Sequence, residues 1–90
     1  MIFFVYILRT SLNTLYIGQT NDLKKRLNEH KSKNSKSAKY TRSFASIELV
    51  YKEEYQTRIE AMQREAQLKT WSHSKKEALI RGDTIELKKL

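Results

Sequence analysis

The chain has 90 residues and no cysteine, carries 18 lysines and arginines against 10 acidic residues, and has a formal net charge of +8 at pH 7. This length leaves room for one hydrophobic core, so we expect a single domain over residues 1–90. The composition excludes disulfides, thiolate metal sites and a cysteine nucleophile, and the charges interrupt every apolar run long before it could span a membrane. Because the N-terminus also lacks the pattern of a secretory signal, we expect a cytoplasmic protein without a membrane partner.

The first predicted element is a β-hairpin. Residues 2–8 and 15–18 are apolar and rich in strand-forming side chains, and residues 11–14 supply turn-forming types between them. If Tyr6 pairs with Tyr16 across the hairpin, the two phenols project side by side from one face of the sheet.

A helix over residues 23–31 follows the hairpin. Residues 20–22 are good N-cap types, and apolar or aromatic side chains then recur at helical spacing. Arg26 and His30 lie one turn apart at the edge of the apolar stripe, so both can extend toward the sheet. Three polar side chains point to solvent: Lys24, Lys25 and Asn28.

Residues 32–46 are mostly polar, lack periodicity and predict a loop. Most of the positive charge lies here and in the preceding helix, because residues 24–42 hold eight basic residues against one acid, Glu29. Such a local excess favours a polyanion, and nucleic acid is the expected polyanion for a basic cytoplasmic domain. A solvated basic surface without a partner is the structural alternative. The eight basic residues are Lys24, Lys25, Arg26, Lys31, Lys33, Lys36, Lys39 and Arg42.

A third strand and further helices complete the predicted elements. Residues 47–51 favour a strand, with Ile47, Leu49 and Tyr51 on one face. After it, a capping residue followed three positions later by glutamate marks each predicted helix start. The predicted helices run from Thr57 with Glu60 to Lys69, from Ser74 with Glu77 to Arg81, and from Asp83 with Glu86 to the end of the chain.

Glu65 lies in the middle of the apolar arc predicted for the helix over residues 57–69. The arc consists of Leu68, Ala61, Met62, Ala66 and Ile59. A carboxylate directed into a small core needs a partner. Two partners fit equally well: an arginine such as Arg26 in an ion pair, or a divalent cation bound by the carboxylate oxygens.

Taken singly, the other candidates have ordinary explanations. His30 and Tyr6 are each of a type that often packs half-buried in a core with its polar atom satisfied. A glycine-rich phosphate loop, a paired-histidine zinc helix and a nucleophile elbow are all missing from the sequence. Nucleotide-binding, zinc-protease and triad-hydrolase functions therefore have no support.

Taken together, the candidate residues form a known pattern. Phe4-Val5-Tyr6 precedes Tyr16-Ile17-Gly18 by about ten residues, Arg26 and His30 follow on the next helix, and Glu65 lies on a later helix. This pattern resembles the GIY-YIG nuclease domain, with Phe4 in place of the first glycine. The resemblance extends from residue 2 to about residue 80, and the chain looks most like the small bacterial proteins that consist of this domain alone.

The resemblance implies an α+β fold, a three-stranded antiparallel sheet flanked by helices. It also implies cleavage of phosphodiesters with Mg²⁺ or Mn²⁺ as the cofactor. In the implied site, Tyr6 activates water directly or as a relay, Tyr16 positions the phosphate, Arg26 binds it, His30 accepts the proton and Glu65 is the metal ligand. Further nucleic-acid contacts are expected from Lys24, Lys25, Lys33, Lys36, Lys39, Tyr40 and Arg42.

Two functions are compatible with the sequence. The first is a metal-dependent nuclease acting on nucleic acid, with DNA as the expected polymer and branched, nicked or repair-related forms as candidate substrates. The second is a catalytically weak or inactive nucleic-acid-binding module that acts with a partner protein, which would supply specificity. The intact catalytic quintet favours the first function.

Overall fold

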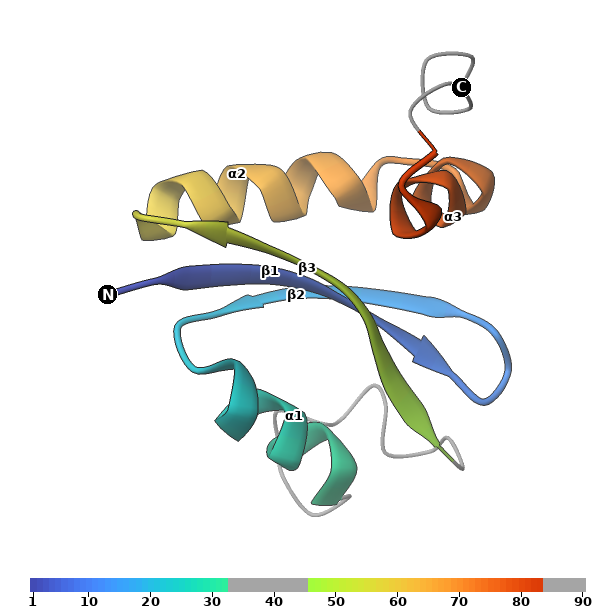
Figure 1. The fold of residues 1–90 in the computed structure, drawn as a ribbon, viewed down its shortest axis with the longest axis horizontal. Coiled ribbons are helices and arrows are strands. Elements are labelled where there is room, and N and C mark those ends of the chain that lie inside the picture. The colour runs from blue at the N-terminus through green and yellow to red at the C-terminus, as the bar shows by residue number, and fades with distance from the viewer. Residues whose placement is uncertain (33–45, 84–90) are drawn as a thin grey trace.

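A three-stranded antiparallel sheet forms the centre of the structure, a computed structural model that describes residues 1–32 and 46–83. β1 (Phe3–Thr10) lies between β2 (Leu15–Thr20) and β3 (Ile47–Tyr55). Figure 1 shows α1 (Leu23–Ser32) on one face of the sheet, and α2 (Arg58–Lys69) and α3 (His73–Arg81) on the other. This arrangement confirms the expected α+β fold.

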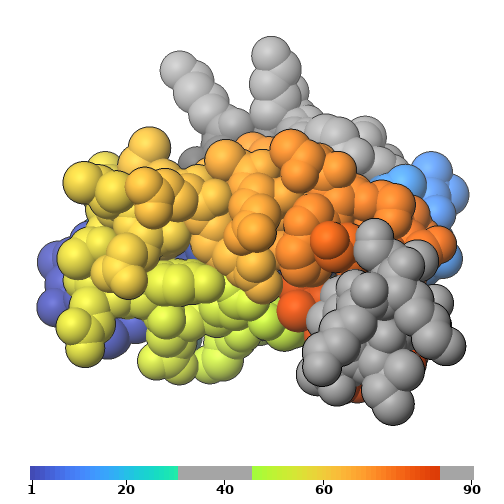
Figure 2. All heavy atoms as spheres, turned by 90° about the horizontal axis from the view of Figure 1, so that it is seen from above, coloured from blue at the N-terminus to red at the C-terminus, as the bar shows by residue number. Residues whose placement is uncertain are grey.

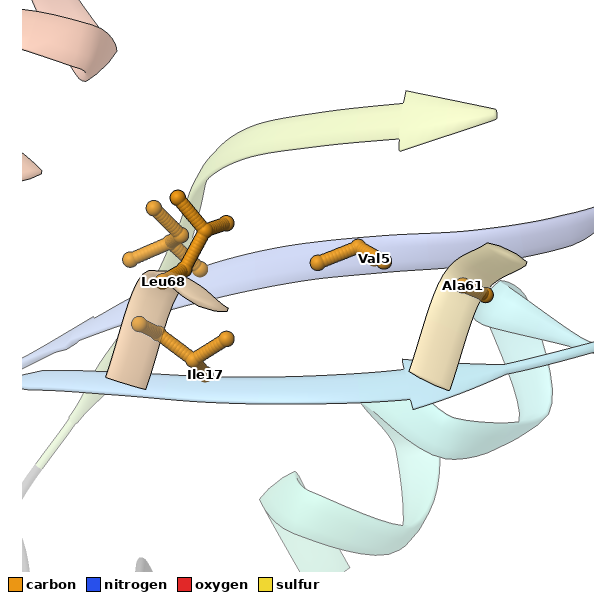
Figure 3. Close-up of a cluster of buried hydrophobic side chains, with 5 residues drawn as sticks. Val5, Ile17, Ala61 and Leu68 are labelled. Carbon is orange, nitrogen blue, oxygen red and sulfur yellow. The ribbon is translucent and has the colours of Figure 1, made fainter. Parts of the chain in front are cut away.

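The central strand β1 supplies side chains to both faces, because successive residues of a strand alternate. Val5 and Ile7 point toward α2 and form the hydrophobic core together with Ile17 of β2 and with Ala61 and Leu68 of α2 (Figure 3). The alternate residues of β1, among them Tyr6 and Leu8, belong to the face that α1 covers. The sheet thus separates an apolar core on the α2 face from the aromatic and polar groups on the α1 face.

The predicted hairpin is confirmed, but its predicted register is wrong. Tyr6 pairs with Gly18, and Tyr16 pairs with Leu8. The backbone N–H of Thr10 donates to the carbonyl of Thr14, and Asn13 adopts a positive φ of 63°, so the turn closes two residues further along than the Tyr6–Tyr16 pairing required. A shift of two residues preserves the face of every side chain, and both phenols remain on the α1 face.

The third strand is longer than predicted and contains a bulge. Tyr51 pairs with Ile7 whereas Leu49 pairs with the next residue of β1, Leu8, so Val50 is the extra residue. The bulge puts Ile47 and Leu49 on the α1 face and Tyr51 on the α2 face. The prediction that these three residues share one face is therefore wrong.

The helix boundaries follow the predicted caps in two of three cases. Asp22 Oδ1 accepts the N–H of Lys25 at the start of α1, and the Thr57 hydroxyl accepts the N–H of Glu60 at the start of α2. α3 begins two residues earlier than predicted, because the hydroxyl of Ser72, not of Ser74, caps it. Glu77 binds Arg9 of β1 and takes no part in a cap.

The predicted apolar arc of α2 is only partly buried. Ala61 and Leu68 are buried, while Ile59 and Met62 are exposed. No helix within residues 1–32 and 46–83 is both long enough and apolar enough to cross a membrane. The predicted basic loop over residues 32–46 and the last predicted turn, from Asp83 to residue 90, lie almost entirely outside the described residues.

Candidate active site

Tyr6 lies at the centre of β1, is fully buried, and faces Gly18 of β2 directly. Its ring extends across the backbone of Gly18, because a methyl group at residue 18 would lie 2.6 Å from Cζ of Tyr6. Any other side chain at this position would collide with the ring, so the glycine is required by close approach. Since β2 is an edge strand, the phenol of Tyr6 extends toward the edge of the sheet.

Tyr16 joins Tyr6 on the α1 face as its diagonal neighbour. The two ring centroids lie 6.5 Å apart, and the Tyr16 ring meets the His30 ring edge-on at 5.2 Å. These spacings are typical of tilted aromatic pairs in contact. The expectation that both phenols lie side by side is confirmed, although they are not directly opposite.

The short connection from β2 to α1 places Arg26 and His30 against the sheet. Asp22 caps α1 directly after β2 ends, so the helix begins next to the strand that carries Tyr16 and Gly18. His30 is buried, and Nε2 of its ring lies 3.2 Å from the Tyr6 hydroxyl. The predicted orientation of His30 toward the sheet is confirmed.

Both members of the Tyr6–His30 pair are held in their neutral forms. Burial, and next the neighbouring Tyr16, raise the pKa of Tyr6 far above its ordinary value, although Arg26 opposes this shift. Burial and the charge of Arg26 lower the pKa of His30, and Glu29 opposes them only in part. The Tyr6 hydroxyl and Nε2 of His30 share one hydrogen bond, and the tautomer of the imidazole decides which of the two groups donates.

The side chain of Arg26 has one hydrogen-bond donor, Nε–H, that makes no hydrogen bond in the described part of the chain. Its Nε lies 3.3 Å from Oε1 of Glu29, which is close enough for an ion pair. Nevertheless, this buried Nε–H makes no hydrogen bond to any described residue. An unpaired buried donor is costly, and an arriving anion would satisfy it. Arg26 therefore suits the binding of a phosphate oxygen.

Glu65 approaches the site from the other face of the sheet. Arg64 lies on one side of the buried stripe of α2 and binds Glu53 of β3, with Nε 2.9 Å from Oε1. Glu65 lies on the opposite side of the same stripe and so faces β2, the edge toward which Tyr6 extends. Its charge raises the pKa of the Tyr6 hydroxyl, which puts the carboxylate within electrostatic range of that group.

Glu65 forms its ion pair within its own helix. The ion partner of Glu65 is Lys69, one turn along α2, at 3.3 Å, and the ion partner of Arg26 is Glu29. The alternative of an Arg26–Glu65 ion pair is therefore not what the structure contains. About a fifth of the Glu65 side chain is exposed, so its oxygens are open to a ligand from solvent.

The donor set of the site is compatible with a weakly held divalent cation. In the described part of the chain, no group of three or more histidine, aspartate and glutamate side chains could hold a metal ion. Mg²⁺ nonetheless binds through one or two carboxylates when water and phosphate oxygens supply its other ligands. Glu65 is a hard oxygen donor of this kind, and its charge acts on the Tyr6 hydroxyl.

Comparison with known proteins identifies the family. The family described as the GIY-YIG catalytic domain matches residues 2–78. This chain belongs to the GIY-YIG family. Among relatives, a UPF0213 protein of Bacillus pumilus is 46% identical over 83 residues, which is 92% of this chain and 83% of the relative. A UPF0213 protein of Natronomonas pharaonis is 40% identical over 90% of this chain and 93% of its own.

A solved structure supports the same assignment of the GIY-YIG fold. The solution NMR structure of a UPF0213 protein from Bacillus halodurans is similar with a TM-score of 0.59 and 34% sequence identity. The similarity covers 92% of this chain and 86% of that chain. The fold class expected from the sequence is thereby confirmed at both the sequence and the structural level.

The expected nucleic-acid contacts of this GIY-YIG chain are described only in part. Lys24 and Lys25 are exposed on the first turn of α1, as the helical pattern predicts. The remaining expected contacts lie outside the described residues: Lys33, Lys36, Lys39, Tyr40 and Arg42.

One residue next to the candidate site was not predicted from the sequence. Glu29 is the ion partner of Arg26 and also raises the pKa of His30. The signal that could have identified it is its spacing of three residues from Arg26 on a helix, which brings opposite charges into contact.

Proposed function

We propose that this protein is a divalent-metal-dependent nuclease that hydrolyses phosphodiester bonds in nucleic acid, with DNA as the expected polymer. The observation that carries the proposal is the buried hydrogen bond between Tyr6 and His30, with the unsatisfied Nε–H of Arg26 beside it. A packing role alone does not explain why a neutral proton acceptor, a phenol and an unpaired guanidinium donor meet at one sheet edge.

The Tyr6–His30 pair would move the proton of the attacking water. Phenolate formation in the free protein is disfavoured by burial, so Tyr6 acts better as a relay than as an ionised base. The hydroxyl oxygen of Tyr6 takes a proton from water while its own proton moves to Nε2 of His30. The water oxygen then attacks the phosphorus as hydroxide. The proton stays on His30, which becomes an imidazolium.

Nucleic acid itself would favour this transfer. The charge of Arg26 lowers the pKa of His30 and so opposes imidazolium formation in the free protein. A bound phosphate neutralises Arg26 and adds negative charge near His30, which removes part of that opposition. His30 thus becomes a better proton acceptor when the substrate is in place.

The charge that develops on the phosphate would be stabilised from two sides. Arg26 offers planar donors that can bind two phosphate oxygens at once. A divalent cation held by Glu65 would polarise the phosphate and stabilise the leaving oxygen. Tyr16, next to both Tyr6 and His30, would orient the same phosphate.

The deciding variant is Glu65→Gln. We expect cleavage of labelled DNA in Mg²⁺ or Mn²⁺ to be lost, because the only proposed protein ligand of the metal is removed. Binding measured in EDTA is expected to persist, and stability should change little. The only ion pair of Glu65 recorded among the described residues is the helical contact with Lys69, and such pairs contribute about 0.3 to 0.5 kcal/mol.

Glu54→Gln is the matched control, because Glu54 is an exposed carboxylate on β3. This variant should cleave as the parent does. If Glu65→Gln cleaves at the parental rate, the metal role of Glu65 is wrong. If the parent binds duplex, single-stranded, flap and junction DNA but cleaves none of them with either metal, the protein is instead the nucleic-acid-binding module.

A further inference from the structure

One side of α2 is apolar although it faces solvent. Ile59 is 68% exposed and Met62 is 49% exposed, and they lie one turn apart, with Ala66 exposed on the turn after. Figure 2, which looks onto α2, shows this helix lying across the outside of the molecule. Two cations border the stripe, Arg58 at its start and Lys69 at its end. We call these five residues the α2 flank.

The α2 flank adjoins the candidate active site. Met62 precedes Glu65 by three residues, so their side chains are neighbours on the helix surface. Going round α2, the positions run from Arg64, which binds β3, to Glu65, which faces β2, and then to the α2 flank. A phosphate bound at Glu65 would therefore lie next to Met62.

The charges beside the apolar stripe favour nucleic acid as its occupant. Arg58 stacks over Phe3 with its guanidinium carbon 5.7 Å from the ring centroid, which keeps the cation near the surface of the sheet. The side chain of Lys69 is more than half exposed, and its ammonium lies 3.3 Å from Oε2 of Glu65. Phosphates would meet both cations, but they gain nothing from the side chains of Ile59 and Met62.

Apolar side chains contact a nucleic acid through its bases and sugars. In a regular duplex the base faces are covered by stacking, whereas unpaired nucleotides expose them. Isoleucine and methionine are also among the side chains that insert where base pairs are opened or unstacked. The combination of a cation at each end and an apolar stripe between them fits a short unpaired segment better than a continuous duplex.

We infer that the α2 flank binds unpaired or unstacked nucleotides next to the cleaved phosphate, so that the protein prefers DNA with an opened segment at the cleavage site. This inference rests on the proposed function. Ile59 and Met62 contact the bases, and Arg58 and Lys69 contact the flanking phosphates.

The test compares the double variant Ile59→Ala/Met62→Ala with the parent. Affinities are measured by fluorescence anisotropy in EDTA, for a short duplex and for the same duplex with a few unpaired nucleotides at its centre. We expect the variant to lose about tenfold in affinity for the opened DNA, because the apolar contact area is removed. Its affinity for the paired duplex should stay within about twofold, and its salt dependence should not change, because no charge is removed.

Two further variants keep the test decisive. Met62→Leu retains the apolar side chain and should bind opened DNA as the parent does. Leu12→Ala removes an equally exposed apolar side chain at the hairpin turn, away from Glu65, and should also behave as the parent. Thermal melting of each variant verifies that these exposed substitutions leave the fold intact.

The outcomes separate this inference from the proposed function. If the parent binds and cleaves DNA but the double variant binds opened DNA equally well, only the inference fails. It also fails if both DNAs are weakened alike, or if the parent is a dimer in sedimentation that the double variant dissociates without change in DNA affinity. If the parent neither binds nor cleaves nucleic acid, the proposed function fails first.

Discussion

Burial shifts the pKa values of Tyr6 and His30 in opposite directions, and both shifts favour the neutral forms. A neutral phenol and a neutral imidazole can share a proton without placing a charge in the core. This property depends on the surrounding residues, because Gly18 gives the ring its space and α1 supplies the imidazole. The same burial that stabilises the fold thus prepares the pair for proton transfer.

The lowered pKa of His30 predicts a loss of stability on mild acidification. A histidine in the unfolded chain has a pKa of about 6.5. Below that pH the unfolded state takes up a proton that folded His30 resists, so the free energy of unfolding falls as pH falls, until the folded pKa is reached. The slope in this window is at most about 1.4 kcal/mol per pH unit. Urea denaturation between neutral pH and the onset of carboxylate titration measures it.

The controls for this prediction are the two histidines themselves. His30→Gln should be less stable at neutral pH but should lose the slope below the ordinary histidine pKa. His73→Gln removes the more exposed histidine, at the start of α3, and controls for the loss of an imidazole as such. If His30→Gln retains the full slope, the acid sensitivity belongs to another group and His30 is not held neutral by burial.

For single residues, the sequence predicts which side chains face the site, but not their ion partners or their strand register. The helical spacing of Arg26 and His30 is sufficient to direct both toward the sheet. The ion partner of Glu65 could not be predicted, because a carboxylate on a helix has several cations in reach until the tertiary contacts select one. The pairing of Tyr16 with Leu8 depends on the geometry of a single turn, which the turn-forming residues permit in several lengths.

Both helices on the α2 face of the sheet combine apolar and charged contacts. α2 packs against the core and pairs Arg64 with Glu53 of β3, and α3 also packs against the core and pairs Glu77 with β1. Arg9 of β1 donates to both carboxylate oxygens of Glu77, at 2.7 Å and 2.6 Å, and His73 lies 3.0 Å from the same carboxylate. Both Arg9 and Glu77 are mostly buried, so this pair is worth more than an ordinary surface pair.

Arg9→Gln is therefore expected to destabilise the protein at neutral pH. We expect a loss of about 1 to 2 kcal/mol, because two charge-assisted hydrogen bonds are removed from a partly buried carboxylate. The hydrogen bonds from Arg9 hold the pKa of Glu77 below its ordinary value. The contribution is thus present above the unfolded carboxyl pKa and is lost as pH falls through the folded pKa. Thermal melting across this range measures the difference.

Arg81→Gln provides a control with the same change of charge. Arg81 lies 4.0 Å from Asp83, and both side chains are largely exposed, so little stability should be lost. A pH-independent difference between Arg9→Gln and the parent would contradict the assignment, because it would mean that the arginine stabilises by packing. Cleavage at moderate temperature should be unaffected by Arg9→Gln, since α3 supplies no residue of the candidate site.

The elements themselves are more predictable than their details. Capping patterns locate the start of α2 to the residue, because the Thr57 hydroxyl accepts the backbone N–H of Glu60 and donates to its carboxylate, both of which are local contacts. The same pattern at Ser74 fails because Glu77 finds a stronger partner in Arg9, a residue distant in sequence. The bulge at Val50 also escapes prediction, since an alternating pattern does not reveal where one extra residue enters a strand.

For the molecule as a whole, the proposed function would depend on two helices that lie on opposite faces of the sheet. α1 brings Arg26 and His30 under the sheet, α2 brings Glu65 over it, and Tyr6 connects them at the edge formed by β2 (Figure 1). Tyr6 and His30 are buried, so a long polymer would meet the site at Arg26 and Glu65, whose side chains are partly exposed. The positive net charge of +8 would then act over the whole approach of that polymer.

The cations at the start of α1 are expected to contact the phosphates of the nucleic acid. Lys24 and Lys25 are exposed at the start of α1, close in sequence to Arg26, and each contact to a phosphate of duplex DNA lowers the slope of log K against log salt by about 0.9. Lys24→Gln/Lys25→Gln should therefore flatten the slope by up to about 1.8, without changing single-turnover cleavage at saturating protein. Lys75→Gln/Lys76→Gln on α3 removes the same charge away from the site and should leave most of the slope. Equal slopes in the two double variants would mean that DNA responds to the net charge of the protein alone, and that the first turn of α1 does not contact the backbone.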